Sequence, residues 1–231
     1  MAKISVNQLA KFLVSNSAQH RAIIKAQIED NSFMSPYYRD AQKAITDFLL
    51  DPSKNEDGII RIIDYLENSP SNSDYEKARL NNNIEALDSF LTMYDEVQYL
   101  EGCSITGVGA PCPKVTINDV EISVFPECVI SGTYRKNNVV GAVKLYFSKP
   151  DPLTVDMAAT VAVLTKKFLE ENCLQIGSVR NQICQVIDVF AKTVHTAPSS
   201  SIRKIGEISA ACEEIKFWWH YFKHAIQVQN P

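Results

Sequence analysis

Apolar residues recur at helical spacing through most of the first hundred positions. Leu9, Phe12 and Leu13 follow Ser5, and Gln8 stands three residues after that serine, which predicts a capped helix. A longer stripe predicts a helix over residues 74–100. Its members are Leu80, Ile84, Leu87, Leu91 and Tyr94. Residues 1–101 are therefore expected to form a helical region, whose last helix packs on a sheet formed by the residues that follow.

The pattern changes at Gly102. Residues 102–113 contain three glycines and two prolines, which predicts a loop and a boundary between the helical region and the rest. Three strands are then expected, over 115–117, 120–131 and 139–148, because β-branched and aromatic residues cluster there. The first two are separated by a tight turn at Asn118-Asp119.

Helical spacing returns after this group of strands. Thr154 and Asp156 predict the start of a helix over about 154–171. Residues 182–190 form a dense apolar run that is typical of a buried strand. The last helix is expected over about 202–228, with one apolar residue every three or four positions. Trp218 and Trp219 are adjacent, so a narrow apolar stripe cannot bury both, and this helix is expected to meet a protein partner or a second copy of the chain.

The order of predicted elements from residue 74 onward is α-β-β-β-α-β. Consecutive strands followed by a helical crossover to one more strand indicate a small mixed sheet with flanking helices. The predicted fold class is therefore α/β, with an α+β-like arrangement, plus the N-terminal helical region.

Composition changes this picture little. Apolar residues make up 45% of the chain and charged residues 22%, and the net charge is −4, so any contact with nucleic acid must come from a local basic patch. The sequence has no apolar run long enough to span a membrane and no secretion-signal pattern. The six scattered cysteines then indicate reduced thiols in a cytoplasmic protein.

The second and third strands should form a hairpin in which Glu127 lies opposite Lys144. Facing residues in an antiparallel hairpin have a constant index sum, and a turn centred near 135 or 136 produces this pair. Pro126 is expected to bend the strand just before Glu127 and to re-aim its side chain. The simplest interpretation of the pair is a cross-strand ion pair, which at an exposed site contributes little.

The arrangement resembles the PD-(D/E)xK nuclease superfamily, which has an α-β-β-β-α-β core. Pro126-Glu127 takes the place of that family's first acidic motif, and Lys144 in GAVKLYF takes the place of its lysine. The resemblance covers about residues 75–190. It implies a nuclease-like core over 102–231, including the C-terminal helix.

The resemblance also implies a metal-dependent chemistry. Glu127 and Lys144 would be the catalytic residues, and Glu127 would bind Mg²⁺. Ala142 stands where the family carries a second acid, so another carboxylate must replace it. Glu85 on the preceding helix is the first candidate, and Asp188 and Glu121 are weaker ones.

Basic residues lie in the hairpin turn and at the end of the third strand. Arg135 and Lys136 lie in its turn and Lys149 ends the third strand, so this half of the chain could present a face to a nucleic-acid backbone or, equally well, to an acidic protein partner. Three functions stay open. The first is a Mg²⁺-dependent nuclease in DNA processing or antiviral defence against foreign DNA. The second is a metal-free interaction subunit of a protein complex with the same fold, and the third is a structural helical adaptor with an unrelated small sheet.

Overall fold

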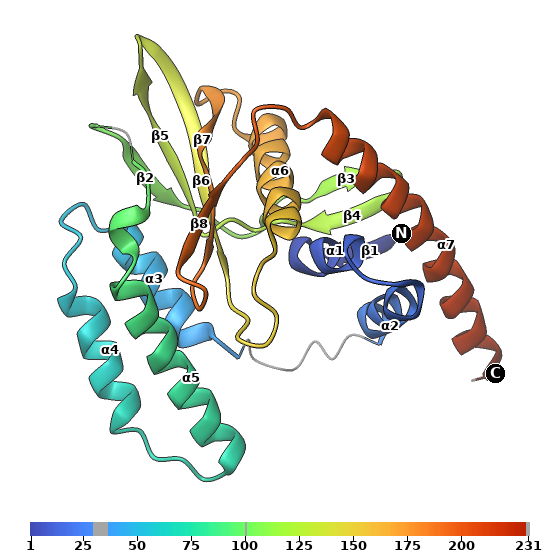
Figure 1. Ribbon diagram of the computed structural model, residues 1–231, viewed down its shortest axis with the longest axis horizontal. Coiled ribbons are helices and arrows are strands. Elements are labelled where there is room, and N and C mark those ends of the chain that lie inside the picture. The colour runs from blue at the N-terminus through green and yellow to red at the C-terminus, as the bar shows by residue number, and fades with distance from the viewer. Residues whose placement is uncertain (30–36, 100, 230–231) are drawn as a thin grey trace.

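The computed structural model describes residues 1–29, 37–99 and 101–229, and for residues 226–229 the backbone alone. It has an α/β fold with two mixed sheets (Figure 1). Within the described part of the chain, no helix is long and apolar enough to cross a membrane.

The larger sheet has the strand order β2-β5-β6-β7-β8. Only β6 and β7 run parallel to each other, and the other neighbours are antiparallel. Helix α6 (Val155–Asn172) makes the crossover that a parallel pair requires. The strands are β2 (Ser104–Gly107), β5 (Cys128–Tyr134), β6 (Asn137–Tyr146), β7 (Ser178–Asp188) and β8 (Thr193–Thr196).

The smaller sheet has the order β1-β4-β3. Strand β1 (Ala2–Ser5) runs parallel to β4 (Val120–Ser123), and β3 (Val115–Ile117) pairs antiparallel with β4. Asn118 and Asp119 form the β3–β4 turn with φ of 48° and 62°, which confirms the predicted tight turn. The sequence did not indicate β1, because its four residues lead directly into a helix.

The predicted strand over 120–131 is wrong in one respect: it is two strands in different sheets. The break lies at Phe125-Pro126. Phe125 has φ of 45°, and Pro126 has no N–H to donate, so the ladder cannot continue through them. The chain leaves the small sheet after Ser123 and enters the large one at Cys128.

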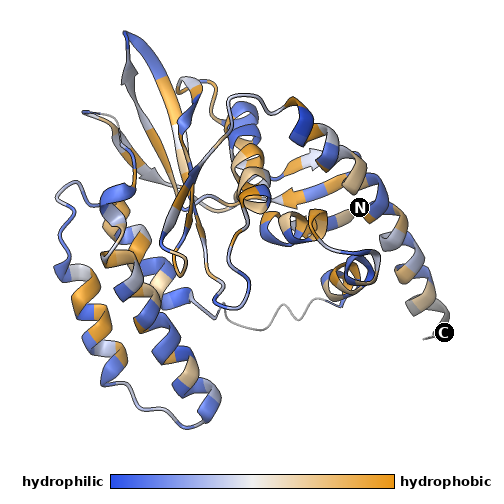
Figure 2. Ribbon diagram, viewed as in Figure 1, coloured by the Kyte–Doolittle hydropathy of each residue, from blue (hydrophilic) through white to orange (hydrophobic). Residues whose placement is uncertain are grey.

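Helices cover both faces of the large sheet (Figure 1). Ala142 of β6 belongs to one apolar cluster and its neighbour Val143 to the other, as expected for a strand that is buried on both faces. The first cluster includes residues of α1 (Val6–Leu13), α2 (Ser17–Ile28), α6 and α7 (Ile202–Gln229). The second includes residues of α3 (Arg39–Leu50), α4 (Asp57–Glu67) and α5 (Asp74–Leu91). Figure 2 shows apolar residues recurring along these helices between hydrophilic ones.

The first hundred residues therefore contribute to both faces and do not form one added layer. Helix α5 is shorter than predicted: it ends at Leu91 and is followed by a 3-10 turn over Tyr94–Glu96. The predicted end at Leu100 falls outside the described residues. The segment 102–113, predicted as a loop, contains the edge strand β2.

The C-terminal helix packs on the N-terminal part of the chain. Its buried stripe is Ile208, Cys212, Ile215 and Trp219, as the spacing predicted. Trp218 lies half-buried beside it, so both tryptophans pack within the chain, and the exposed aromatic residues of α7 are Phe217 and Tyr221.

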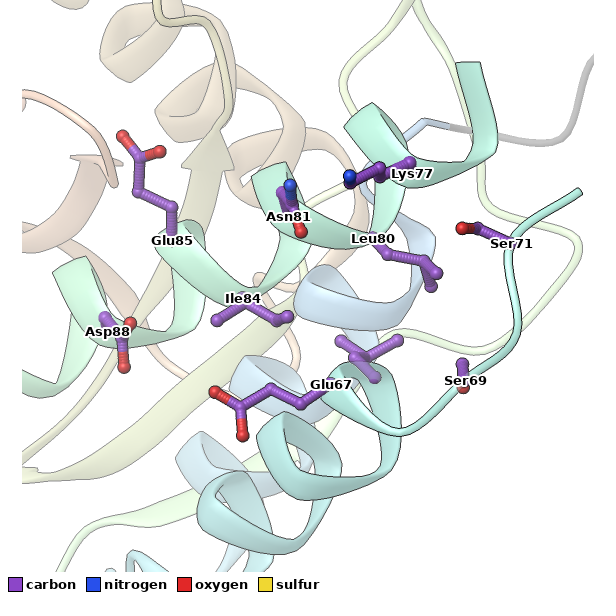
Figure 3. A pocket seen from close by; sticks show the side chains of 10 residues that line it. Glu67, Ser69, Ser71, Lys77, Leu80, Asn81, Ile84, Glu85 and Asp88 are labelled. Atoms are coloured by element: carbon purple, nitrogen blue, oxygen red, sulfur yellow. The ribbon is translucent and has the colours of Figure 1, made fainter. Parts of the chain in front are cut away.

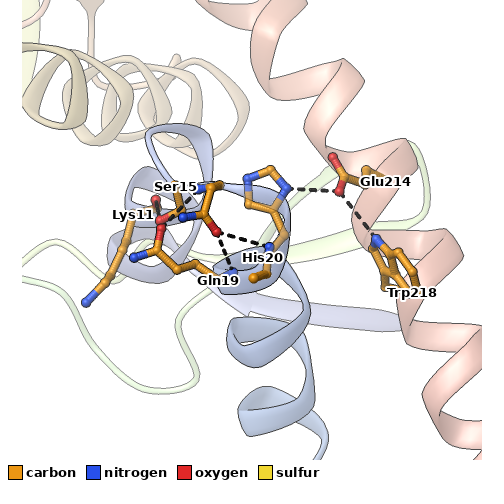
Figure 4. Close-up of polar contacts among 8 residues, drawn as sticks. Lys11, Ser15, Gln19, His20, Glu214 and Trp218 are labelled. Atoms are coloured by element: carbon orange, nitrogen blue, oxygen red, sulfur yellow. Dashed lines mark hydrogen bonds and ion pairs between the residues drawn. The ribbon is translucent and has the colours of Figure 1, made fainter.

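A polar contact joins α2 to the same helix (Figure 4). Nδ1 of His20 lies 2.9 Å from Oε1 of Glu214, and the indole N–H of Trp218 donates to that oxygen at 3.3 Å. The His20 ring also stacks on Phe12, with 3.8 Å between ring centroids. These contacts fix Trp218 against the body of the protein.

Candidate functional site

Glu127 lies where β5 begins. Its backbone N–H donates to the carbonyl oxygen of Val143 at 2.9 Å, and Cys128 pairs with Val143 in the antiparallel ladder. Continuing this register by one residue places Glu127 opposite Lys144. The predicted pairing is therefore confirmed, and the two side chains meet: the Lys144 ammonium donates to Oε1 of Glu127 at 2.8 Å.

Two further donors use the same carboxylate. The Gln42 side-chain amide on α3 donates to Oε1 at 2.8 Å. The backbone N–H of Leu145 donates to Oε2 at 2.6 Å. Strand β5 begins at Cys128 and offers no backbone partner beside Leu145, so the carboxylate takes the place of the missing ladder acceptor.

The pair is buried. The Glu127 side chain is 2% exposed and that of Lys144 is 9% exposed. A charge in such a place is tolerated only when it is paired and hydrogen-bonded, and here one carboxylate has three donors. The arrangement holds three elements together: the start of β5, the C-terminal end of β6 and the helix α3.

Asp188 accepts hydrogen bonds from the backbone of two loops. It is fully buried at the end of β7, where its Oδ2 accepts from the backbone N–H of Leu153 at 2.8 Å and its Oδ1 from that of Ala191 at 3.1 Å. Both of its oxygens thus fix loops, one before α6 and one after β7. The nearby phenol of Tyr146 is also affected: burial foremost, and the negative charge of Asp188 in addition, raise its pKa.

Glu85 is half exposed on α5 and forms an ion pair with Lys149. It lines a hollow of about 410 Å³ beside the end of α4, together with Glu67 and Asp88 (Figure 3). Lys149 also bonds to Oδ1 of Asn82 at 3.0 Å. Glu121 pairs with Lys114 at 3.0 Å in the small sheet. The carboxylates predicted to share one metal therefore each have separate partners.

The donor set does not fit a metal centre in this arrangement. Among the residues that the structure describes, no group of three or more His, Cys, Asp and Glu side chains could hold a metal ion. Both oxygens of Glu127 already accept hydrogen bonds, and one lies against an ammonium group that would repel a cation.

The residues predicted to contact nucleic acid lie at opposite ends of β6. Arg135 and Lys136 form the β5–β6 turn, with φ of 49° and 69°, which confirms the predicted centre of the hairpin. Lys149 follows the other end of β6 and pairs with Glu85.

Sequence reasoning missed Gln42, and it counted Arg180 among the basic residues after the hairpin without placing it beside Tyr134. Gln42 lies one turn before Thr46 on α3, and no motif marked it. Arg180 stacks on Tyr134, with its guanidinium carbon 3.5 Å from the ring centroid. Neither contact has a sequence signal, because each joins elements far apart in the chain.

A comparison with protein-family models finds no match to this chain, and a comparison with curated proteins finds none either.

Proposed function

We propose that this chain is a binding protein with a nuclease-like fold, in which the Glu127–Lys144 pair is an internal structural tie. One observation carries the proposal. The carboxylate that a metal would need is buried, and both of its oxygens are bonded to the protein's own donors. A phosphodiester also could not reach side chains that are 2% and 9% exposed without an opening of the structure.

The order of elements supports the nuclease-like part of the proposal. Helix α5, strands β2, β5 and β6, helix α6 and strand β7 follow one another in the order that the resemblance implies, but the first strand is β2 and not the predicted 115–117, which lies in the small sheet with β4. The acid at the start of β5 and the lysine in β6 also occupy the places that the resemblance implies for them.

The positions of Glu127 and Lys144 favour Mg²⁺-dependent phosphodiester hydrolysis as a second candidate function. It requires that Gln42 and the Leu145 N–H release the carboxylate and that a second acid join it. Either Glu85 or Asp188 would be that second acid, and each would have to leave its present partners to reach Glu127.

Two measurements decide between these functions. The first is cleavage of duplex DNA, single-stranded DNA and RNA with Mg²⁺ or Mn²⁺, comparing wild type with Glu127→Gln and Lys144→Met. We expect no metal-dependent cleavage by any of the three. The second is thermal unfolding, in which a bound ion would raise the midpoint. We expect the same midpoint with millimolar Mg²⁺ as with EDTA. Cleavage by wild type that needs the metal and disappears in both variants would refute the structural role.

A further inference from the structure

The tip of the β5–β6 hairpin projects beyond its neighbours in the sheet. Strand β2 pairs with β5 only as far as Ser131, and β7 begins opposite Val139. The pairs from Gly132–Val139 to Tyr134–Asn137 thus extend past β2. Three residue pairs reach about 10 Å at the usual rise per residue. Figure 1 shows this arm, residues 132–138, standing clear of the rest of the sheet.

Tyr134, in the outermost residue pair of the arm, contacts two arginines. The guanidinium carbon of Arg180 lies 3.5 Å from the ring centroid of Tyr134, and that of Arg135 lies 5.2 Å from the same centroid. A bulge brings Arg180 there: Val140 pairs with Val179 but Ala142 pairs with Cys184, so β7 has four residues opposite the single Gly141.

Gly141 is needed for this bulge. A Cβ at that position would lie 2.2 Å from the carbonyl oxygen of Ile183. The close approach of the two backbones is therefore possible only with glycine, and the position of Arg180 depends on it.

No ion pair among the described residues neutralises the positive charge of the arm. Residues 128–150 and 173–187 contain no aspartate or glutamate. In the described part of the chain, Arg135, Lys136 and Arg180 take part in no ion pair. The lysines of α6 differ, since Lys166 and Lys167 pair with Glu170 and Glu171.

We infer that this arm binds the phosphate backbone of duplex DNA. The inference deepens the proposed function and rests on it, because it names the partner of a fold that binds without cutting. Two unpaired cations at the tip of a projecting ribbon, with Arg180 of β7 stacked on its tyrosine, match a dense line of phosphates. A two-stranded β-ribbon fits the wide major groove of B-DNA, whereas the deep, narrow major groove of A-form RNA does not admit side chains in this way.

The other surface features of the arm agree with this partner. Its residues expose no large apolar side chain, and Figure 2 shows a hydrophilic tip, so the arm lacks the apolar centre of a protein interface. Asn137 and Asn138 are exposed next to the turn. Their amides can donate to and accept from phosphates or base edges.

The turn geometry offers a variant that removes charge without harming the fold. Arg135 and Lys136 both have positive φ, which Asn and Gly adopt more readily than Arg and Lys. The double variant Arg135→Asn/Lys136→Gly should therefore unfold at the same denaturant concentration as wild type or a higher one. The matched control is Lys25→Ala/Lys43→Ala, which removes the same charge from lysines of α2 and α3 that pair with acids.

The experiment is fluorescence anisotropy with a labelled 30-base-pair DNA of mixed sequence, in EDTA, at NaCl concentrations from 50 to 200 mM. Wild type should bind with a salt-dependent affinity. The arm variant should bind at least about tenfold more weakly and lose about two units of salt slope, because two phosphate contacts disappear. The control variant should bind as wild type does.

Three results would overturn the inference: no salt-dependent binding by wild type, equal binding by the arm variant and wild type, or stronger binding of the arm to duplex RNA or polyglutamate than to DNA. Metal-dependent cleavage of the duplex would instead refute the proposed function. Because binding is measured in EDTA, the two failures are distinguishable.

Discussion

Replacing Lys144 by methionine would leave the Glu127 carboxylate buried with only two neutral donors. Those donors are the Gln42 amide and the Leu145 N–H. Removing one partner of a buried pair leaves an uncompensated charge, which costs about 3–5 kcal/mol of unfolding free energy. In a chain of this size that corresponds to a loss of about 6–20 °C in the unfolding midpoint. Glu127→Gln should cost a similar amount, because it leaves the ammonium group unpaired.

The double variant should lose much less unfolding free energy than the sum of the losses in the two single variants. It removes both charges, and the glutamine can still accept from Leu145. We expect Glu127→Gln/Lys144→Met to be no less stable than the worse single variant, with an interaction energy of about 3 kcal/mol in the double-mutant cycle.

The assay is urea unfolding of the wild type and the three variants, followed by far-UV circular dichroism. The half-exposed pair of Lys149 and Glu85 serves as control, and Lys149→Met should cost less than about 1 kcal/mol. Single costs at Glu127 and Lys144 as small as this control, or costs that add to within about 0.5 kcal/mol, would show that the buried pair is not a structural tie.

Three further outcomes test other parts of the structure. Gly141→Ala should prevent stable folding, because its Cβ would lie 2.2 Å from a carbonyl oxygen of β7, and soluble expression reports this. As the control, a Cβ at Gly206 in α7 has no atom within 4 Å, so Gly206→Ala should raise the unfolding free energy by about 0.5–1 kcal/mol, measured by urea unfolding. Asp188→Asn should cost about 1–3 kcal/mol in the same unfolding assay, since one of its two acceptor oxygens becomes a donor that faces a backbone N–H. Burial raises the pKa of the Cys128 thiol to about 12, so almost no thiolate exists at pH 8, and mass spectrometry after iodoacetamide treatment of the native protein should find the more exposed Cys103 modified and Cys128 intact. Equal modification of both thiols would contradict that burial.

Local patterns allowed several elements to be predicted from the sequence. Thr154 caps α6 by accepting from the N–H of Met157, and Ser5 caps α1 in the same way from Gln8. The apolar stripe of α7 is buried as its spacing indicated. These features depend on residues within one or two helical turns of each other, so a linear pattern contains all the information that they require.

The hairpin register also followed from the sequence, because a turn and an index sum determine which residues face each other. Glu127 therefore lies beside Lys144 as predicted. The division of residues 120–131 between two sheets could not be predicted from the sequence, because it depends on the pairing of β4 with β1, which is more than a hundred residues away in the chain.

The sequence by itself determined most of the helices, the caps of α1 and α6, the α/β class and the pairing of Glu127 with Lys144. Only the tertiary structure decided what that pair can do. Gln42 reaches it from α3, the Leu145 N–H needs an acceptor, and Glu85 and Asp188 are held by other partners. The same is true of the arm, where a bulge in β7 brings Arg180 to Tyr134. The physical reason is that burial and hydrogen-bond partners come from segments far apart in the chain, which no local pattern of residues encodes.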